Sequence, residues 1–252
     1  MLVTIPYCER DLESLSALLD SLCAVSPSDS GHHDLLTIRD SRSPSMPPIC
    51  RGQAHSFFDM DREVSGDYEG WGNPVNGAFD IAANWANARC GIRAMAPISF
   101  FFCEPDVVFI RDGALTKLLT AWSMACVPFS GPICQSAGVG CYANGVMVYD
   151  SRISMLTHRL KETPEPFDIA MRDLIIPNMV GNNLIYQSPP GGWKIGVNTP
   201  SAEALVAKAL DHGAVAIHAV KDPEDARKVI SAAVSAARAG SSSPGSSTGT
   251  QP

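Results

Sequence analysis

The sequence predicts an α/β fold with a mostly parallel central sheet flanked by helices. The main observation is the stretch 98–113, ISFFFCEPDVVFIRDG, in which an apolar run is broken by two acids and then resumes. A run that is apolar on both faces is typical of a strand inside a parallel sheet covered by helices. The second observation is a β-rich run at 2–5, a helical leucine pattern at 12–22 and another β-rich run at 34–39. This order predicts a β-α-β unit at the start of the chain.

The remaining segments continue the alternation of strands and helices. Helices are expected at 76–89, 114–126, 151–160, 201–210 and 223–239, and strands at 145–149 and 214–218, while 183–186 is a short apolar run. Two stretches are expected to be loops, 40–72, which is rich in Ser, Pro and Gly, and 128–142, which contains several glycines. We expect a single domain over residues 1–239, followed by a flexible Ser/Gly/Pro-rich tail at 240–252.

The charge balance limits the classes of partner. The chain has a formal net charge of −7 and no cluster of Lys and Arg residues. A broad nucleic-acid-binding surface needs a basic face, so the sequence predicts none. The charge balance is compatible only with a small local contact with a polynucleotide.

Cysteine usage and apolar runs bear on the compartment. The eight cysteines are scattered without a CxxC pair, which argues against a zinc knuckle and favours free thiols in a reducing compartment. The N-terminus lacks the basic start and long apolar core of a signal peptide. No run approaches the roughly 20 apolar residues that span a bilayer. We therefore expect a cytoplasmic protein without a membrane span.

An acid pair ends the predicted central strand. Glu104 and Asp106 stand on either side of Pro105, at the strand end where open α/β sheets bind their ligands. Carboxylate oxygens suit a hard divalent cation that leaves room for phosphate oxygens. Asp59 and Asp61 form a rival pair, but they lie in the expected loop 40–72 and follow only two phenylalanines. The sequence therefore predicts a metal–diphosphate site at the first pair.

A second polar element follows the late apolar run 214–217. His218 comes directly after it, and Lys221 three residues later. A neutral imidazole at a strand end can act as a third metal ligand, and a lysine can contact a diphosphate as a point charge. An isolated histidine in this position is more often structural, and it is the acid pair that favours a metal ligand here.

The order of these elements and motifs resembles the nucleotide-sugar-dependent glycosyltransferases of the GT-A fold. Members have a nucleotide-binding βαβ region, an acidic D-x-D-type motif ending a central strand, and often a late His with a nearby Lys. The resemblance covers about residues 1–239, in element order rather than in close identity. It implies a GT-A-like (nucleotide-diphospho-sugar transferase) domain that binds Mn²⁺ or Mg²⁺ through Glu104, Asp106 and His218, with Lys221 on the phosphates. The chain departs from the family in having Glu at the first acidic position.

The resemblance also implies residues that face the nucleotide or sugar. These are Thr4 in the first strand, Pro6, which ends that strand, and Tyr7 after it, Arg39 and Asp40 at the end of the second strand, and Asn76 at the start of the helix before the acidic motif. Three of these residues have a simpler alternative: Tyr7 as a core aromatic, Arg39 as a surface charge and Asn76 as a helix N-cap.

The segments after the central strand would face the acceptor. The stretch 130–144 resembles the acceptor- and sugar-facing segment, and its glycines permit close backbone approach. Asp168 is the candidate general base for an inverting transfer, in which one carboxylate takes the proton of the acceptor hydroxyl. Its alternative is an N-cap aspartate, and Asp173 and Glu165 are weaker rivals. The sequence leaves the retaining or inverting outcome open.

The function that the resemblance implies is a metal-dependent, hexosyltransferase-type glycosyltransferase acting on a nucleoside-diphosphate sugar and a hydroxyl acceptor. The acceptor is open: a glycan, a lipid-linked sugar, a protein side chain, or a hydroxymethylated pyrimidine in viral DNA, since gripping one extruded base needs few phosphate contacts. One alternative is a nucleotidyltransferase, although residues 6–9, PYCE, replace the Gly-rich basic loop usual there. Another is a non-catalytic nucleotide-sugar binder.

Overall fold

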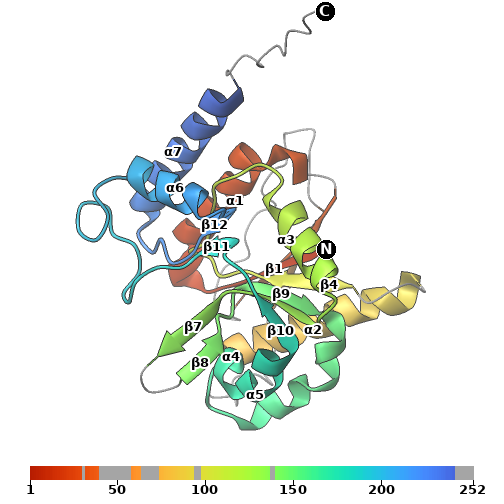
Figure 1. The fold of residues 1–252 in the computed structure, drawn as a ribbon. Helices are drawn as coiled ribbons and strands as arrows, with labels where there is room; N and C mark the ends of the chain where they lie inside the picture. Colours follow the sequence, from red (N-terminus) through yellow and green to blue (C-terminus); the bar gives the residue numbers. More distant parts are fainter. Residues whose placement is uncertain (30–31, 40–57, 64–73, 94–97, 137–139, 242–252) are drawn as a thin grey trace, which may run out of the picture.

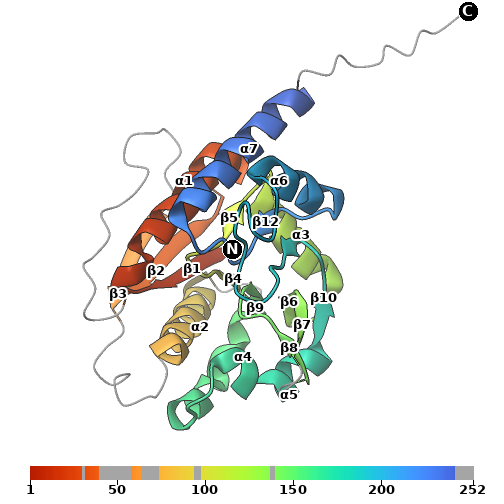
Figure 2. The ribbon, with the colours of Figure 1, turned by 90° about the vertical axis from the view of Figure 1, so that its left-hand side faces the viewer.

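The computed structural model describes residues 1–29, 32–39, 58–63, 74–93, 98–136 and 140–241. Their main feature is a seven-stranded sheet in the order β10-β6-β9-β4-β1-β2-β3 (Figures 1 and 2). The strands are β1 (Leu2–Tyr7), β2 (Asp34–Arg39), β3 (Phe58–Glu63), β4 (Ser99–Phe102), β6 (Phe129–Gly131), β9 (Met147–Asp150) and β10 (Met179–Gly181). All run parallel except β9, which is antiparallel to both of its neighbours. The predicted mostly parallel sheet and its β-α-β start are confirmed.

Two smaller sheets extend this one. Three short strands pair in the order β11-β12-β5, namely β11 (Ile185–Tyr186), β12 (Ala216–Ile217) and β5 (Val108–Phe109). A hairpin is formed by β7 (Ile133–Ser136) and β8 (Gly140–Ala143). Because β5 follows β4 directly in the chain, residues 103–107 lead from the large sheet into the three-stranded one.

Helices cover both faces of the large sheet (Figure 2). One face packs against α1 (Leu12–Val25) and α3 (Ala114–Ala125), and the other against α2 (Pro74–Arg93), α4 (Phe167–Ala170) and α5 (Arg172–Ile175). Two further helices, α6 (Ala202–Asp211) and α7 (Pro223–Ser241), pack on the three-stranded sheet, and α7 also lies along α1. Short 3₁₀ helices are η1 (Glu9–Asp11), η2 (Pro27–Asp29), η4 (Ser151–Met155), η5 (Thr157–Glu162) and η6 (Ile176–Asn178).

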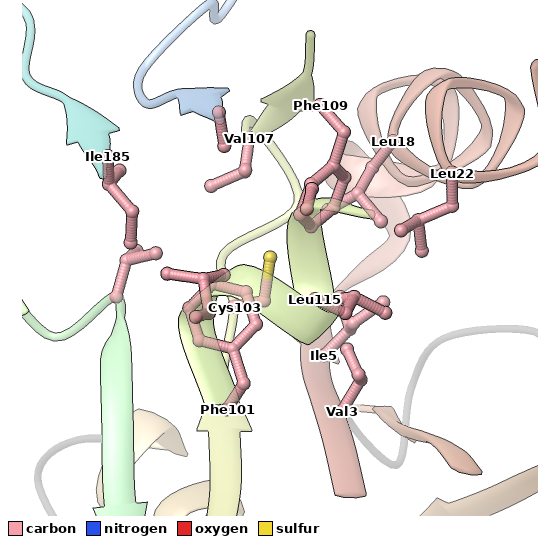
Figure 3. Packing of buried hydrophobic residues seen from close by; sticks show 14 of the residues in the cluster. Val3, Ile5, Leu18, Leu22, Phe101, Cys103, Val107, Phe109, Leu115 and Ile185 are labelled. Carbon is pink, nitrogen blue, oxygen red and sulfur yellow. The ribbon is translucent and has the colours of Figure 1, made fainter. Parts of the chain in front are cut away.

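The central strand β4 is buried on both faces, as its apolar run predicts. Phe101 lies in the same hydrophobic cluster as Val3 and Ile5 of the neighbouring strand β1, beneath α1 and α3 (Figure 3). Phe100 and Phe102 point to the opposite face, where they pack with Phe79 of α2. Alternate side chains of β4 thus fill two cores, which fixes the end of this strand rigidly.

Four expectations about local structure are corrected. Residues 58–63, expected within a loop, form β3, the last strand of the sheet in the described part of the chain, and charged sequences are common in edge strands. The expected loop 128–142 contains β6, β7 and β8, and Gly131 permits the close approach of Met147 from β9. Strand β1 continues through Pro6, because its pairing with β4 ends at Thr4 and the missing amide of proline falls beyond that ladder. The expected helix at 151–160 consists of the 3₁₀ helices η4 and η5.

A buried carboxylate holds the start of α3. Asp29 is fully buried, and its two oxygens accept hydrogen bonds from the amides of Leu115 and Thr116 at 2.7 and 3.0 Å. The hydroxyls of Ser26 and Thr116 donate to it as well. Burial acts to raise the pKa of Asp29, but these bonds and that from His33 outweigh it and hold the pKa well below its usual range. Asp29 therefore caps a helix distant in sequence while ionised.

We expect Asp29→Asn to lower the free energy of unfolding at pH 7 by about 2 kcal/mol, because buried donors lose an acceptor. A carboxylate with a lowered pKa stabilises the fold above its unfolded pKa of about 4 and loses this contribution as pH falls below it. The difference from wild type in urea unfolding should therefore shrink between pH 7 and pH 3. The control is Asp112→Asn just before α3, because the exposed carboxylate of Asp112 accepts hydrogen bonds from Ser28 and its loss should cost less. A difference that is unchanged with pH would contradict this role.

Candidate metal centre

The topology brings the acid pair and the late histidine together. Residues 104–106 leave the C-terminal end of β4, and β5 then pairs antiparallel with β12, so that Val108 lies opposite Ile217. The pairing is extended by a hydrogen bond from the amide of Val220 to the carbonyl of Asp106, at 3.0 Å. The amide of His218 donates to the carbonyl of Tyr186 at 3.0 Å. Backbone bonds thus place His218 beside the acidic turn.

Three side chains converge here in a group that we call the acid–His cluster, Glu104, Asp106 and His218. Nε2 of His218 lies 3.1 Å from Oε2 of Glu104 and 3.5 Å from Oδ1 of Asp106. One potential ligand atom from each residue lies within 4.8 Å of the others. The cluster is half-buried, at the C-terminal edge of the central strand, where ligands of open α/β sheets bind.

The donor set fits a divalent cation. Oδ1 of Asp106 is buried and accepts no hydrogen bond from the part of the chain that the structure describes. A buried carboxylate oxygen without a donor is costly unless a charge compensates it. Two carboxylates and one imidazole suit Mn²⁺ or Mg²⁺, and three protein ligands leave coordination positions for phosphate oxygens. The predicted ligands therefore lie together in an arrangement that can hold such an ion.

Electrostatics couple the three groups. Burial acts to raise the pKa of Glu104, but a hydrogen bond from His218 and the positive charges of His218 and Lys221 lower it overall. Burial raises the pKa of Asp106, and the charge of Glu104 adds to the effect. Burial would lower the pKa of His218, yet the two carboxylates raise it. The two carboxylates thus favour the protonated, positively charged form of His218.

Lys221 lies at the rim of the cluster on a tight turn. Its side chain is exposed, and its aliphatic part lies close to Gly192, where an added Cβ would be 3.2 Å from Cγ of Lys221. Ala219, between His218 and Lys221, has a φ of +63°, which is unusual for a residue with a side chain. The amide of Trp193 donates to the carbonyl of Ala219 at 2.8 Å and holds the turn. Strained backbone of this kind is common at functional sites.

Two side-chain amides, which the sequence pattern does not indicate as site residues, lie on the far side of His218. Oε1 of Gln187 lies 3.0 Å from Nδ1 of His218 and 3.1 Å from Nδ2 of Asn144. Gln187 directly follows β11, so the argument that picked out His218, a polar residue at a strand end, could have found it. Asn144 was included only within the segment 130–144. Its place next to His218 depends on the pairing of β9 with β4, which a sequence pattern does not reveal.

Asp168 lies near the cluster on α4. Phe167 anchors this helix by stacking on Phe79 of α2, with ring centroids 4.0 Å apart. Burial and the nearby charge of Glu104 raise the pKa of Asp168 to about 6, while hydrogen bonds from the backbone of Ile169 and Gly145 lower it. The structure thus places Asp168 within electrostatic reach of Glu104, as a carboxylate that is ionised at neutral pH. Its rival Asp173 is fully solvated, with 96% of its side chain exposed.

Asn76 supports the segment that leads to Asp168. It is fully buried, and its Nδ2 donates to the carbonyl of Glu165 at 2.9 Å. The helix α2 begins at Pro74, and proline is favoured in the first turn of a helix. Asn76 is therefore the third residue of the helix and neither opens nor caps it. In this position Asn76 ties α2 to the residues just before α4.

The residues expected to face the nucleotide lie on β1 and β2. Tyr7 and Arg39 are register partners at the C-terminal ends of these strands, and Pro6 precedes Tyr7 at a half-buried position. Thr4 lies deeper in β1, where it is fully buried and its hydroxyl donates to the carbonyl of Phe101 at 3.1 Å. The hydroxyl of Thr4 is therefore used in a hydrogen bond between two strands of the sheet. Asp40 lies outside the described residues.

The rival acid pair is placed elsewhere. Asp59 and Asp61 belong to β3, which two strands, β1 and β2, separate from β4. Among the described residues, the acid–His cluster is the one group of three metal-ligand side chains whose ligand atoms all lie within 4.8 Å of one another.

None of the described helices combines the length and the apolar character needed to cross a membrane.

Comparisons with known proteins bear on the fold. No protein-family model matches the chain, and no curated protein matches it in sequence. The galactosyltransferase LgtC, solved in complex with donor and acceptor sugar analogues, has a TM-score of 0.51 and 11% identity, covering 94% of this chain and 96% of LgtC. The glycosyltransferase GlyE of Streptococcus pneumoniae TIGR4 has a TM-score of 0.53 and 11% identity, covering 95% of this chain and 63% of GlyE. These similarities confirm the predicted GT-A-like fold.

Two adjacent glycines allow a matched test of the turn. Gly191 and Gly192 have φ angles of +90° and +84°, so alanine at either should cost about 1–2 kcal/mol of stability. An added Cβ meets nothing within 4 Å at Gly191 but lies 2.8 Å from the carbonyl oxygen of Ala219 at Gly192. We therefore expect Gly192→Ala, and not Gly191→Ala, to weaken Mn²⁺ binding measured by calorimetry. Equal Mn²⁺ affinity in the two variants would contradict the importance of the turn at Ala219 for Mn²⁺ binding.

Proposed function

We propose that this protein is a metal-dependent glycosyltransferase that moves a sugar from a nucleoside-diphosphate sugar to a hydroxyl acceptor. The observation that carries the proposal is the acid–His cluster at the end of β4, in a fold shared with solved glycosyltransferases. Paired carboxylates, an imidazole and an adjacent lysine suit a divalent cation with a bound diphosphate. All these groups belong to the single domain that we propose for residues 1–239.

The cluster and its rim would bind the donor. Glu104, Asp106 and His218 would hold Mn²⁺ or Mg²⁺, which when bound neutralises charge on the departing diphosphate. Lys221 would contact the diphosphate oxygens, since it is exposed and its charge acts on both acids of the cluster.

The nucleotide would lie against the C-terminal ends of β1 and β2. Pro6, Tyr7 and Arg39 would form this contact, together with Asp40, which follows Arg39 in the chain. Thr4 and Asn76 are buried and hydrogen-bonded within the protein, so we propose that they support the site without touching the donor.

Asp168 would act as the general base of an inverting transfer. Its carboxylate would take the proton of the acceptor hydroxyl while that oxygen attacks the anomeric carbon and the bond to the diphosphate oxygen breaks. A pKa of about 6 leaves it ionised at neutral pH and more basic than an ordinary aspartate. The stack of Phe167 on Phe79 and the bond from Asn76 to Glu165 would hold this carboxylate in position.

The activity should require the acid–His cluster. In a panel of UDP-, GDP- and TDP-sugars with Mn²⁺, we expect one donor to be hydrolysed or transferred with release of nucleoside diphosphate. Asp106→Asn should abolish this release, because the substituted amide is a poor ligand for a hard cation. Asp173→Asn, which changes an exposed acid, should retain it.

Three outcomes would contradict the proposal. Normal turnover of Asp106→Asn at saturating metal would remove the role of the cluster. Pyrophosphate release would indicate nucleotidyl transfer, and donor binding without turnover would indicate a non-catalytic binder.

The transfer rate should fall at low pH with the protonation of Asp168. Because the base must be ionised and its pKa is raised to about 6, kcat should decrease as pH falls through about 6 and level off above it. Asp168→Asn should lower kcat by about 10²–10⁴-fold, with donor affinity retained. Steady-state kinetics between pH 5 and pH 8 measures both effects. A low-pH decrease that persists in the residual activity of Asp168→Asn would assign the base to another group.

A further inference from the structure

The two ring nitrogens of His218 face different surroundings. Nε2 points to the carboxylates of Glu104 and Asp106, whereas Nδ1 lies 3.0 Å from Oε1 of Gln187. A histidine binds a metal through a nitrogen that carries a lone pair, so the location of the ring proton decides whether Nε2 can be a ligand. The groups around Nδ1 therefore bear on which of the two nitrogens carries the ring proton.

A backbone amide fixes the direction of this hydrogen-bond chain. The amide of Val146 donates to Oδ1 of Asn144 at 2.9 Å, which identifies that atom as the oxygen of the side chain. Nδ2 of Asn144 must then face Gln187, at 3.1 Å from the nearer amide atom. That atom has to be an acceptor, Oε1, and the same oxygen can accept the proton of Nδ1 of His218.

The reversed orientation of Gln187 is disfavoured. It would set the amino group of Gln187 against that of Asn144, leaving two donors face to face at a cost of about 1–3 kcal/mol. In the observed orientation, Nε2 of Gln187 is buried without a hydrogen-bond partner among the described residues. The orientation that places the oxygen of Gln187 beside His218 thus leaves the amino group of Gln187 without a partner among the described residues.

We propose that Gln187 and Asn144 are positioning residues that hold the ring proton of His218 on Nδ1 and leave Nε2 free to bind a divalent cation. This inference rests on the proposed metal-dependent function and adds a second layer to its site. Partners of this kind set the tautomer and orientation of metal-binding histidines, and their loss lowers metal affinity by about 10–100-fold.

Removing the acceptor should reverse the tautomer. Nδ2 of Asn144 lies 3.4 Å from Nδ1 of His218, so in Gln187→Met it can donate to that nitrogen. The ring proton would then move to Nε2 and block the metal. In Gln187→Glu, a carboxylate oxygen still accepts the proton of Nδ1.

The test is the Mn²⁺ dissociation constant of the full chain, measured by calorimetry without donor. We expect Gln187→Met to weaken binding about 10–100-fold and Gln187→Glu to bind at least as tightly as wild type. In a His218→Ala background, Gln187→Met should have no further effect, because it acts through the imidazole. Thermal unfolding establishes that each variant is folded, and Asn144→Ala, which frees Gln187 to rotate, provides a second weakened variant if Gln187→Met does not fold.

The outcomes separate this inference from the proposed function. Wild-type affinity in Gln187→Met, or in Asn144→Ala if that variant is needed, overturns the positioning role while leaving the metal site intact. A loss that persists in the His218→Ala background also overturns it, since Gln187 would then act by another route. Wild-type protein that does not bind Mn²⁺ overturns the proposed function and this inference together.

Discussion

The antiparallel pairing of β5 with β12 is the constraint on which the candidate site depends. It brings together Glu104 and His218, which are 114 residues apart in the sequence. The acidic turn is fixed on one side by β4, whose side chains fill two hydrophobic cores, and on the other by the backbone bond between Val220 and Asp106. A turn tied to two sheets cannot relax easily, so its carboxylates stay close despite their mutual repulsion.

The site concentrates features that cost stability. Two half-buried carboxylates share one imidazole, a buried oxygen of Asp106 lacks a hydrogen-bond donor among the described residues, and Ala219 adopts a positive φ. Each feature is unfavourable for folding alone, and a bound cation with a diphosphate would compensate the first two. The network around Asp29 shows the contrast, because there a buried carboxylate is fully hydrogen-bonded and only holds a helix in place.

The sequence predicted the parts of the fold and site that depend on local patterns. The apolar run before Glu104 identified the central strand, and the run before His218 identified a strand end, although only Ala216 and Ile217 form β12. Strand β3 was missed because an edge strand can carry a polar sequence that resembles a loop. The hairpin of β7 and β8 was missed because its strands are short and lie close to several glycines.

The orientation of a side-chain amide could not be predicted from the sequence. Gln187 and Asn144 meet His218 only because three strand ends, of β11, β12 and β9, converge at one edge. Thr4 shows the opposite case: its place on the first strand was predicted correctly, but its hydroxyl is used within the sheet. Which face a residue presents at a strand end depends on the neighbouring strands, and these come from distant parts of the chain.

The central claim is that the acids and the histidine hold one divalent cation, and pulsed electron paramagnetic resonance of the Mn²⁺ complex tests it most directly. The account predicts the coupling of a single directly bound imidazole nitrogen, present in wild type and in His158→Ala, which removes an exposed histidine, and absent in His218→Ala. Bound Mn²⁺ without a nitrogen coupling, or with a coupling that survives in His218→Ala, would contradict the account.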